Sequence, residues 1–117
     1  MSIAGQEIAR ASGELVTRSG DDLFWNDGQT DRKLSVSIVT ASPVSRLLHA
    51  GINLDAAGAP VAAAGLFDLG IAPAFLPGDD AARGMVAVKD LATRILTAFA
   101  REAEEIEWAC AKVRPVV

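Results

Sequence analysis

The feature that most constrains the fold is a change of hydrophobic period part-way along the chain. Between residues 32 and 54 apolar and polar residues alternate, whereas from about Asp80 onward apolar residues recur every three or four positions. Alternation is typical of half-buried β-strands, and the longer period is typical of an amphipathic helix. Strands followed by a helix indicate an α+β fold. We expect a small antiparallel or mixed sheet of about four strands with a long C-terminal amphipathic helix.

The alternating stretch predicts a β-hairpin around Ser42-Pro43. Pairing Thr40 with Arg46 leaves residues 41–45 as a loop of allowed length. In this register the apolar side chains of both strands share one face and the polar side chains share the other. The polar face then holds Lys33, Ser35 and Ser37 of the first strand and His49, Gly51 and Asn53 of the second.

This polar face has two interpretations. A cation, two hydroxyls, an imidazole and an amide suit a small anionic or polar ligand, with Lys33 as the point charge and Asn53 as a hydrogen-bond partner. The alternative is an ordinary antiparallel sheet with one face in water, which gives the same alternation. No Asp or Glu lies in the strand of His49, the single histidine, so the pattern does not support a catalytic triad.

The remaining residues predict shorter elements before the hairpin and one long helix after it. We expect a helix over 2–12, strands over 15–18 and 22–25, a polar loop over 26–31, and a connection over 55–78 that contains one short helix. All 117 residues are expected to form a single domain.

The C-terminal helix carries an apolar stripe that we expect to face the core. Its members are Val88, Leu91, Ala92, Ile95, Phe99, Ile106, Cys110 and Val113. Thirty residues would span about 45 Å, which is long for so small a domain, so a break near Gly84 is expected. Cys110 is predicted to be a small buried hydrophobe. Glu102, Glu104, Glu105 and Glu107 are predicted to form a solvated face.

Composition narrows the classes of function. The net charge is −4 and no cluster of basic residues is visible, so nucleic-acid binding is not expected. One cysteine and one histidine allow neither an internal disulfide nor an ordinary zinc site, and no metal or cofactor is expected. No apolar run approaches the roughly 20 residues that a membrane span needs. Glu7 and Arg10 interrupt the apolar N-terminal stretch, unlike a secretory signal, so a cytoplasmic protein is expected.

Three short segments resemble the catalytic domain of biotin and lipoate protein ligases. These are FWND at 24–27, RKLSVSI at 32–38 and HAGINL at 49–54. The resemblance implies that Lys33 contacts the carboxyl and phosphate of a ligand and its adenylate, and that Asn26 and Asp27 lie beside the nucleotide. The Gly-Arg-Gly-Arg loop with which the ligases clamp the adenylate has no counterpart here, so the isolated chain is not expected to be an active enzyme.

A broader resemblance links the chain to an uncharacterised prokaryotic family, domain of unknown function 366. Residues 21–71 and the ending ACAKVR at 109–114 are similar to the C-terminal half of that family. The resemblance implies no known activity, and it implies that this chain is a truncated half of a larger domain.

Two functional hypotheses follow. The first is a relative of a ligase-like domain that binds a small carboxylate or adenylate through Lys33, Ser35, Ser37, His49, Asn53, Asn26 and Asp27. The second is a non-catalytic half-domain that forms a homodimer or pairs with a missing partner half, because a small sheet with open edges tends to recruit a partner.

Overall fold

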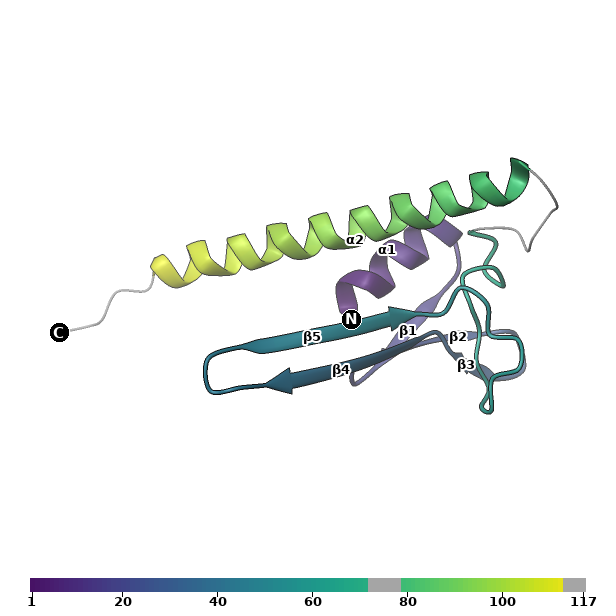
Figure 1. Cartoon of the computed structure of the whole chain (residues 1–117), viewed down its shortest axis with the longest axis horizontal. Helices are drawn as coiled ribbons and strands as arrows, with labels where there is room; N and C mark the ends of the chain where they lie inside the picture. The colour runs from purple at the N-terminus through teal and green to yellow at the C-terminus, as the bar shows by residue number, and fades with distance from the viewer. Residues whose placement is uncertain (72–78, 113–117) are drawn as a thin grey trace.

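The computed structural model describes residues 1–71 and 79–112, and it describes side chains for all of these except 79–84. The α+β class with antiparallel sheets and a C-terminal helix is confirmed (Figure 1). The elements are α1 (Ser2–Ser12), β1 (Val16–Ser19), β2 (Asp22–Asn26), β3 (Asp31–Lys33), β4 (Ser35–Ala41), β5 (Arg46–Ile52) and α2 (Asp79–Ala111). The expected single sheet of four strands is wrong, since β1-β2-β3 form one sheet and β4-β5 form another.

The first half of the chain folds as its turn residues predict. Helix α1 ends at Gly13, whose φ of 73° gives the left-handed cap that favours glycine. Strands β1 and β2 meet at a turn in which Gly20 has a φ of 62°. The polar loop after Asn26 connects β2 to β3, and both pairs of strands are antiparallel. The helix over 2–12, the two strands and the loop are therefore confirmed.

The hairpin forms, but its predicted register is wrong by one residue. Ala41 pairs with Arg46, so the turn contains only residues 42–45. Its own hydrogen bonds close the turn: the Ser42 amide donates to the Ser45 carbonyl over 2.8 Å, and the Ser45 amide donates to Ser42 Oγ over 3.0 Å. The slip sets Ile38 opposite His49 and leaves no polar face common to both strands.

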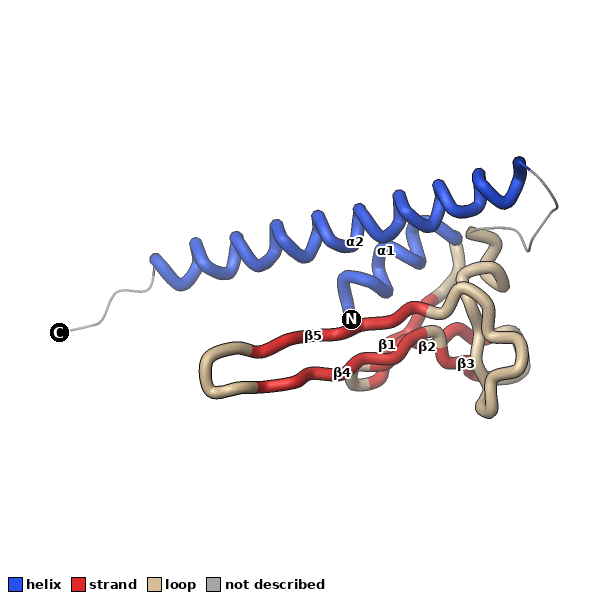
Figure 2. Tube along the Cα trace, viewed as in Figure 1, coloured by secondary structure: helices blue, strands red, loops and turns tan. Residues whose placement is uncertain are grey.

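The hydrophobic core occupies one end of the molecule. Its buried members are Ala4 and Ile8 of α1, Leu23 of β2, Leu34, Ala64, Leu66, Leu69 and Leu91 of α2. Three of these come from the connection after β5, which is packed in turns beside the sheets (Figure 2). Residues 55–71 contain no helix, and the rest of the predicted connection, 72–78, lies outside the described residues.

Packing of this connection depends on a close backbone approach. A Cβ atom on Gly65 would lie 2.2 Å from the carbonyl oxygen of Leu54, so only glycine fits there. The Leu66 amide donates to the Asn53 carbonyl over 2.9 Å and holds the two segments together. The connection therefore forms part of the core layer.

Helix α2 is continuous over 33 residues, so the predicted break near Gly84 is wrong. A single glycine costs about 1 kcal/mol relative to alanine without removing a backbone hydrogen bond, which is too little to interrupt the helix. Leu91 is buried and Ile95 packs against the core. Beyond Ile95 the helix projects past the core, in the same direction as the tip of the β4–β5 hairpin (Figure 1).

The expected core-facing stripe on α2 is only partly confirmed. Phe99 and Ile106 are more than half exposed, and Cys110 is exposed where we predicted a buried side chain. The physical reason is the length of the helix, which extends beyond the layer it could pack on. Val113 lies outside the described residues. The four glutamates from Glu102 to Glu107 are exposed, as predicted.

Candidate functional site

A small polar cluster lies where β2 begins. The Ser19-Gly20 turn places Asp21 and Asp22 at the start of β2, and the pairing of Phe24 with Lys33 sets Lys33 on the neighbouring strand. Lys33 Nζ lies 3.1 Å from Asp22 Oδ1, and each side chain is about one-third exposed. The structure thus provides one lysine held by a carboxylate at the surface of the three-stranded sheet.

Ser37 joins the same cluster from the hairpin. Its hydroxyl donates to Asp21 Oδ2 over 2.8 Å. This hydrogen bond is the main cause of the lowered pKa of Asp21, to which the backbone amide of Asp21 and the charge of Lys33 also contribute. The Asp21 carboxylate is therefore ionised at neutral pH, and Lys33 and Ser37 each have an internal partner.

Asn26 and Asp27 stabilise the loop that carries them. Asp27 Oδ1 accepts the amides of Gln29 and Thr30 over 2.9 and 2.8 Å, and Oδ2 binds the Arg32 guanidinium. The Thr30 amide, Arg32 and the Gln29 amide, in that order, lower the pKa of Asp27 to about 2. Asn26 Oδ1 accepts the Gly28 amide in the same loop.

Ser35 and Asn53 hold the core layer together. Ser35 is fully buried, and its Oγ accepts the Leu23 amide over 2.9 Å. The Asn53 side chain donates from Nδ2 to the carbonyls of Lys33 and Ala64, both over 3.2 Å. These two side chains thus join β2, β3 and the connection, and their polar atoms are occupied by the backbone.

The predicted site residues fall into separate places. Lys33 and Ser37 meet at the Asp21–Asp22 pair. Ser35 is buried and Asn53 is half-buried, and Asn26 and Asp27 belong to the loop. His49 is exposed on β5, opposite Ile38. Asp21 and Asp22 were not among the predicted residues. The turn signal at Ser19-Gly20 directly precedes β2, and β2 pairs with the strand of Lys33, so this signal could have indicated the two aspartates.

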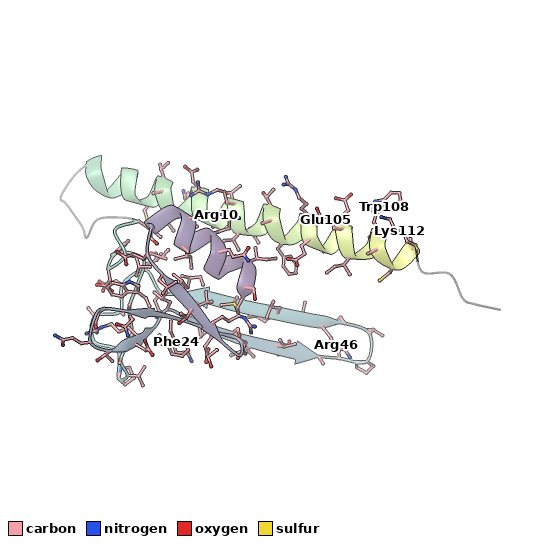
Figure 3. All side chains as sticks on the ribbon, turned by 180° about the vertical axis from the view of Figure 1, so that it is seen from behind. Arg10, Phe24, Arg46, Glu105, Trp108 and Lys112 are labelled. Carbon is pink, nitrogen blue, oxygen red and sulfur yellow. The ribbon has the colours of Figure 1, made fainter. Side chains whose placement is uncertain are left out.

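The two projecting elements carry most of the large exposed apolar side chains. We call the exposed apolar residues of the hairpin, which are each 53–94% exposed, the hairpin patch: Val36, Ile38, Val39, Val44, Leu47 and Leu48. The strand pairing places Val36, Ile38 and Leu47 on one face of the ribbon and Val39 and Leu48 on the other. On the projecting half of α2, Leu96, Phe99, Ile106 and Trp108 are 54–68% exposed. Figure 3 shows Glu105, Trp108 and Lys112 on this end of α2 and Arg46 at the far end of the hairpin. In the described residues neither helix is long and apolar enough to cross a membrane.

Comparison with known proteins identifies the family. Residues 1–114 match the family described as a domain of unknown function, DUF366, and the chain belongs to that family. An uncharacterised protein of Methanocaldococcus jannaschii is 30% identical over 113 residues, which are 96% of this chain and 43% of that protein. A solved structure of a protein of unknown function from Pyrococcus horikoshi is 33% identical with a TM-score of 0.57, and the match covers 99% of this chain and 56% of that one.

The chain therefore spans about half the length of the relatives it matches. None of the three descriptions names an activity or a ligand. The more specific assignment to the C-terminal half of the family, and the likeness of the hairpin to the biotin and lipoate ligases, stay predictions.

Proposed function

We propose that this chain is a non-catalytic module that acts by self-association, in which a second copy of the chain covers apolar side chains of the β4–β5 hairpin or of the projecting half of α2. The observation that carries this proposal is the concentration of exposed apolar side chains on those two elements. Single exposed apolar residues are ordinary on a protein surface, but a concentration of them on two projecting elements is typical of an interaction surface.

The shape of the molecule supports the same proposal. A domain of this length has an expected radius of gyration of about 13 Å. The observed value is 17.2 Å, and the molecule measures 65 × 30 × 29 Å. The excess length lies in elements that extend past the core, and such elements leave apolar surface in water unless a partner covers it.

The energetics favour covering the exposed apolar side chains of the projecting elements. Burying the exposed half of one such side chain contributes roughly 1 kcal/mol. Six residues in the hairpin patch and four on α2 thus give about 10 kcal/mol when all are covered. Loss of translational and rotational freedom on association costs about 4–15 kcal/mol.

The hairpin gives an independent argument. Beyond its base, strands β4 and β5 pair with each other and with no third strand among the described residues. An isolated two-stranded ribbon is marginally stable in water, and its open edges are ready to pair. A partner would stabilise the ribbon and cover its patch in the same step.

The test is the mass and stability of the full chain at several concentrations. Light scattering should give a mass above that of one chain, and the melting temperature should rise with concentration because association stabilises the folded state. A well-folded chain that keeps the mass of one copy, with a melting temperature independent of concentration from about 1 to 100 μM, would refute the proposal.

A second candidate function rests on the polar cluster at the start of β2. Lys33, which the ligase resemblance implies as a ligand contact, and Ser37, a candidate from the predicted polar face, converge there. A small carboxylate or adenylate could replace Asp22 as the partner of the Lys33 ammonium group. The exchange replaces one charge pair with another, so we expect weak binding unless further groups contribute.

Thermal melts with biotin, lipoate, ATP and the two adenylates test this second function. A ligand at a hundred times its dissociation constant stabilises the folded state by about 2.7 kcal/mol. The stabilisation should be absent in Lys33→Ala and retained in the matched variant Lys112→Ala, which removes an exposed lysine just after the end of α2. Equal shifts in both variants would exclude the Lys33 cluster as the binding site.

A further inference from the structure

Helix α2 has two apolar stripes, and only one of them packs on the molecule. Leu91 and Ile95 belong to the first stripe, which faces the core. The second, which we call the seam, consists of Met85, Ala92, Leu96, Phe99, Ala103, Ile106 and Cys110, all of them exposed. At about 100° of rotation per residue, the seam is centred roughly a quarter-turn away from Leu91. The seam is therefore a separate face of the helix.

The spacing of the seam is that of a coiled coil. From Ala92 its residues follow at steps of four, three, four, three and four, and Met85 and Lys89 continue the same alternation toward the N-terminus of α2. A repeat of this kind averages 3.5 residues, the period at which two α-helices pack continuously along each other. Leu96, Phe99 and Ile106 are 68%, 54% and 57% exposed, so the side chains that such a partner helix would cover are available.

The charges of α2 favour one orientation of a partner helix. Residues 85–101 carry Lys89, Arg94 and Arg101 against one carboxylate, Asp90, whereas residues 102–112 carry four glutamates against Lys112. Two copies of α2 in parallel would place the acidic halves side by side. An antiparallel arrangement lays residues 102–110 of each copy along residues 85–93 of the other, whose Lys89 and Asp90 leave no net charge, so that the repulsion between the glutamates is removed.

We propose that α2 is the interface of a homodimer in which the seams of two copies pack as an antiparallel pair. This inference rests on the proposed function and names its partner, a second copy of this chain, and its surface. It assigns Leu96 of one copy to a position opposite the partner's Phe99, and Ala92 opposite the partner's Ala103. The same register brings Lys89 level with the partner's Ile106 and Glu107, where its ammonium group meets the carboxylate.

The placement of α2 in the fold agrees with this arrangement. The N-terminal half of α2 lies over α1, and the other half projects beyond it (Figure 1). In an antiparallel pair the projecting half of each copy lies along the anchored half of the other. Both projecting halves are then covered by the same contact, and the two cores lie at opposite ends of the dimer.

The first test measures dimer dissociation of the full chain by analytical ultracentrifugation. Phe99→Glu, in the middle of the seam, should weaken the dimer by about 30-fold or more, as expected for a buried aromatic at an interface centre. The matched control is Trp108→Glu, which introduces the same charge at an exposed aromatic on the opposite side of α2 and should change the dissociation constant by less than about three-fold. Circular dichroism verifies that both variants remain folded.

The second test determines the relative orientation of the two α2 helices by cross-linking. Chains with Leu96→Cys and chains with Phe99→Cys, both also carrying Cys110→Ser, are mixed and oxidised with diamide, which takes two protons and two electrons from a pair of thiols. The antiparallel register predicts efficient cross-linking between the two kinds of chain. A parallel pair would instead bring the native Cys110 thiols of the two copies together and cross-link the unmodified protein.

The outcomes separate this inference from the function it rests on. Cross-linking through Cys110 would overturn the antiparallel orientation. A dimer that survives Phe99→Glu but is dissociated by Ile38→Glu on the hairpin would overturn the α2 interface, and either result would leave association itself intact. A chain that is a single copy at all concentrations would overturn both. Loss of the dimer in Phe99→Glu together with the Leu96–Phe99 cross-link would establish the antiparallel seam.

Discussion

The two ends of the molecule differ in how their apolar residues are used. At the core end, Leu23 of β2, Leu34 between β3 and β4, and Leu91 of α2 come together and are at most 2% exposed. At the projecting end, residues of the same type on the hairpin and on α2 are more than half exposed, as Leu48 and Leu96 are. In the sequence, the apolar residues of both ends follow an equally regular period. The difference shows that periodicity specifies which face of an element is apolar, whereas only the packing of other elements determines whether that face is covered.

The sharpest test of this difference compares two leucines. Leu34→Ala should lower the free energy of unfolding by about 2–5 kcal/mol, because it removes a fully buried side chain and leaves a cavity. Leu48→Ala, on a residue that is 53% exposed, should lower it by less than about 1 kcal/mol in the dissociated chain. Urea denaturation at low protein concentration measures both values. Similar losses for the two variants would mean that the hairpin is covered in solution even at that concentration.

A pair of serines on β4 makes the same comparison for hydrogen bonds. Ser35→Ala leaves the buried Leu23 amide without its acceptor and should lower the free energy of unfolding by about 1–3 kcal/mol. Ser37→Ala removes a hydroxyl from the accessible Asp21 and should change it by about 0.5 kcal/mol or less. If Ser37→Ala were the more destabilised variant, the core end of the molecule would have to extend along β4 at least as far as Ser37.

The smallest expected effect concerns pH and the loop after β2. The pKa of Asp27 is about 2 in the folded chain and 3.8 unfolded, so the ionised form is favoured by folding. Its contribution to stability is complete above the unfolded value and is lost as the pH falls through about 2. Asp27→Asn should therefore be less stable than the parent at neutral pH, with the difference vanishing in acid. Thermal melts between pH 7 and pH 2 measure the difference in stability between the two proteins. A difference that stayed constant with pH would show that the loss comes from altered packing or hydrogen bonding and not from the charge of Asp27.

The sequence predicted the elements well where local chemistry decides them. Gly13 and Gly20 mark the end of α1 and the first turn because the left-handed conformations there favour glycine. The strands, the loop after Asn26 and the long helix followed from period and turn residues. These signals act over a few residues, so a single sequence is enough to read them.

The sequence failed where the outcome depends on a balance over longer distances. The hairpin register differs by one residue because the hydrogen bonds of Ser42 and Ser45 favour the shorter turn over the matching of apolar faces. Matching the apolar faces of the two strands gains little free energy in a ribbon that no other layer covers. The predicted polar face depended on that matching, and it therefore does not form. Lys33 and Ser37 nevertheless came together, through the Asp21–Asp22 pair rather than across the hairpin.

The exposure of Cys110 and Phe99 has the same origin. Both lie on an apolar stripe, and the sequence alone could not show that α2 extends beyond the layer beneath it. The buried roles of Ser35 and Asn53 were also beyond reach, since each depends on which backbone groups a distant segment brings near. Candidate ligand contacts and structural hydrogen-bond partners have the same residue types, and only their surroundings distinguish them.

The packing of α1 against α2 has a consequence for how fast the chain can fold. Ile8 and Leu91 belong to one core but lie near opposite ends of the described chain. The strand pairs and the hairpin close short loops, whereas this contact closes a long one, and the entropy lost on closing a loop rises with its length. Proteins dominated by such distant contacts fold slowly. We therefore expect the docking of α2 to be a late step, and until it is complete the core leucines and the projecting elements are open to water together.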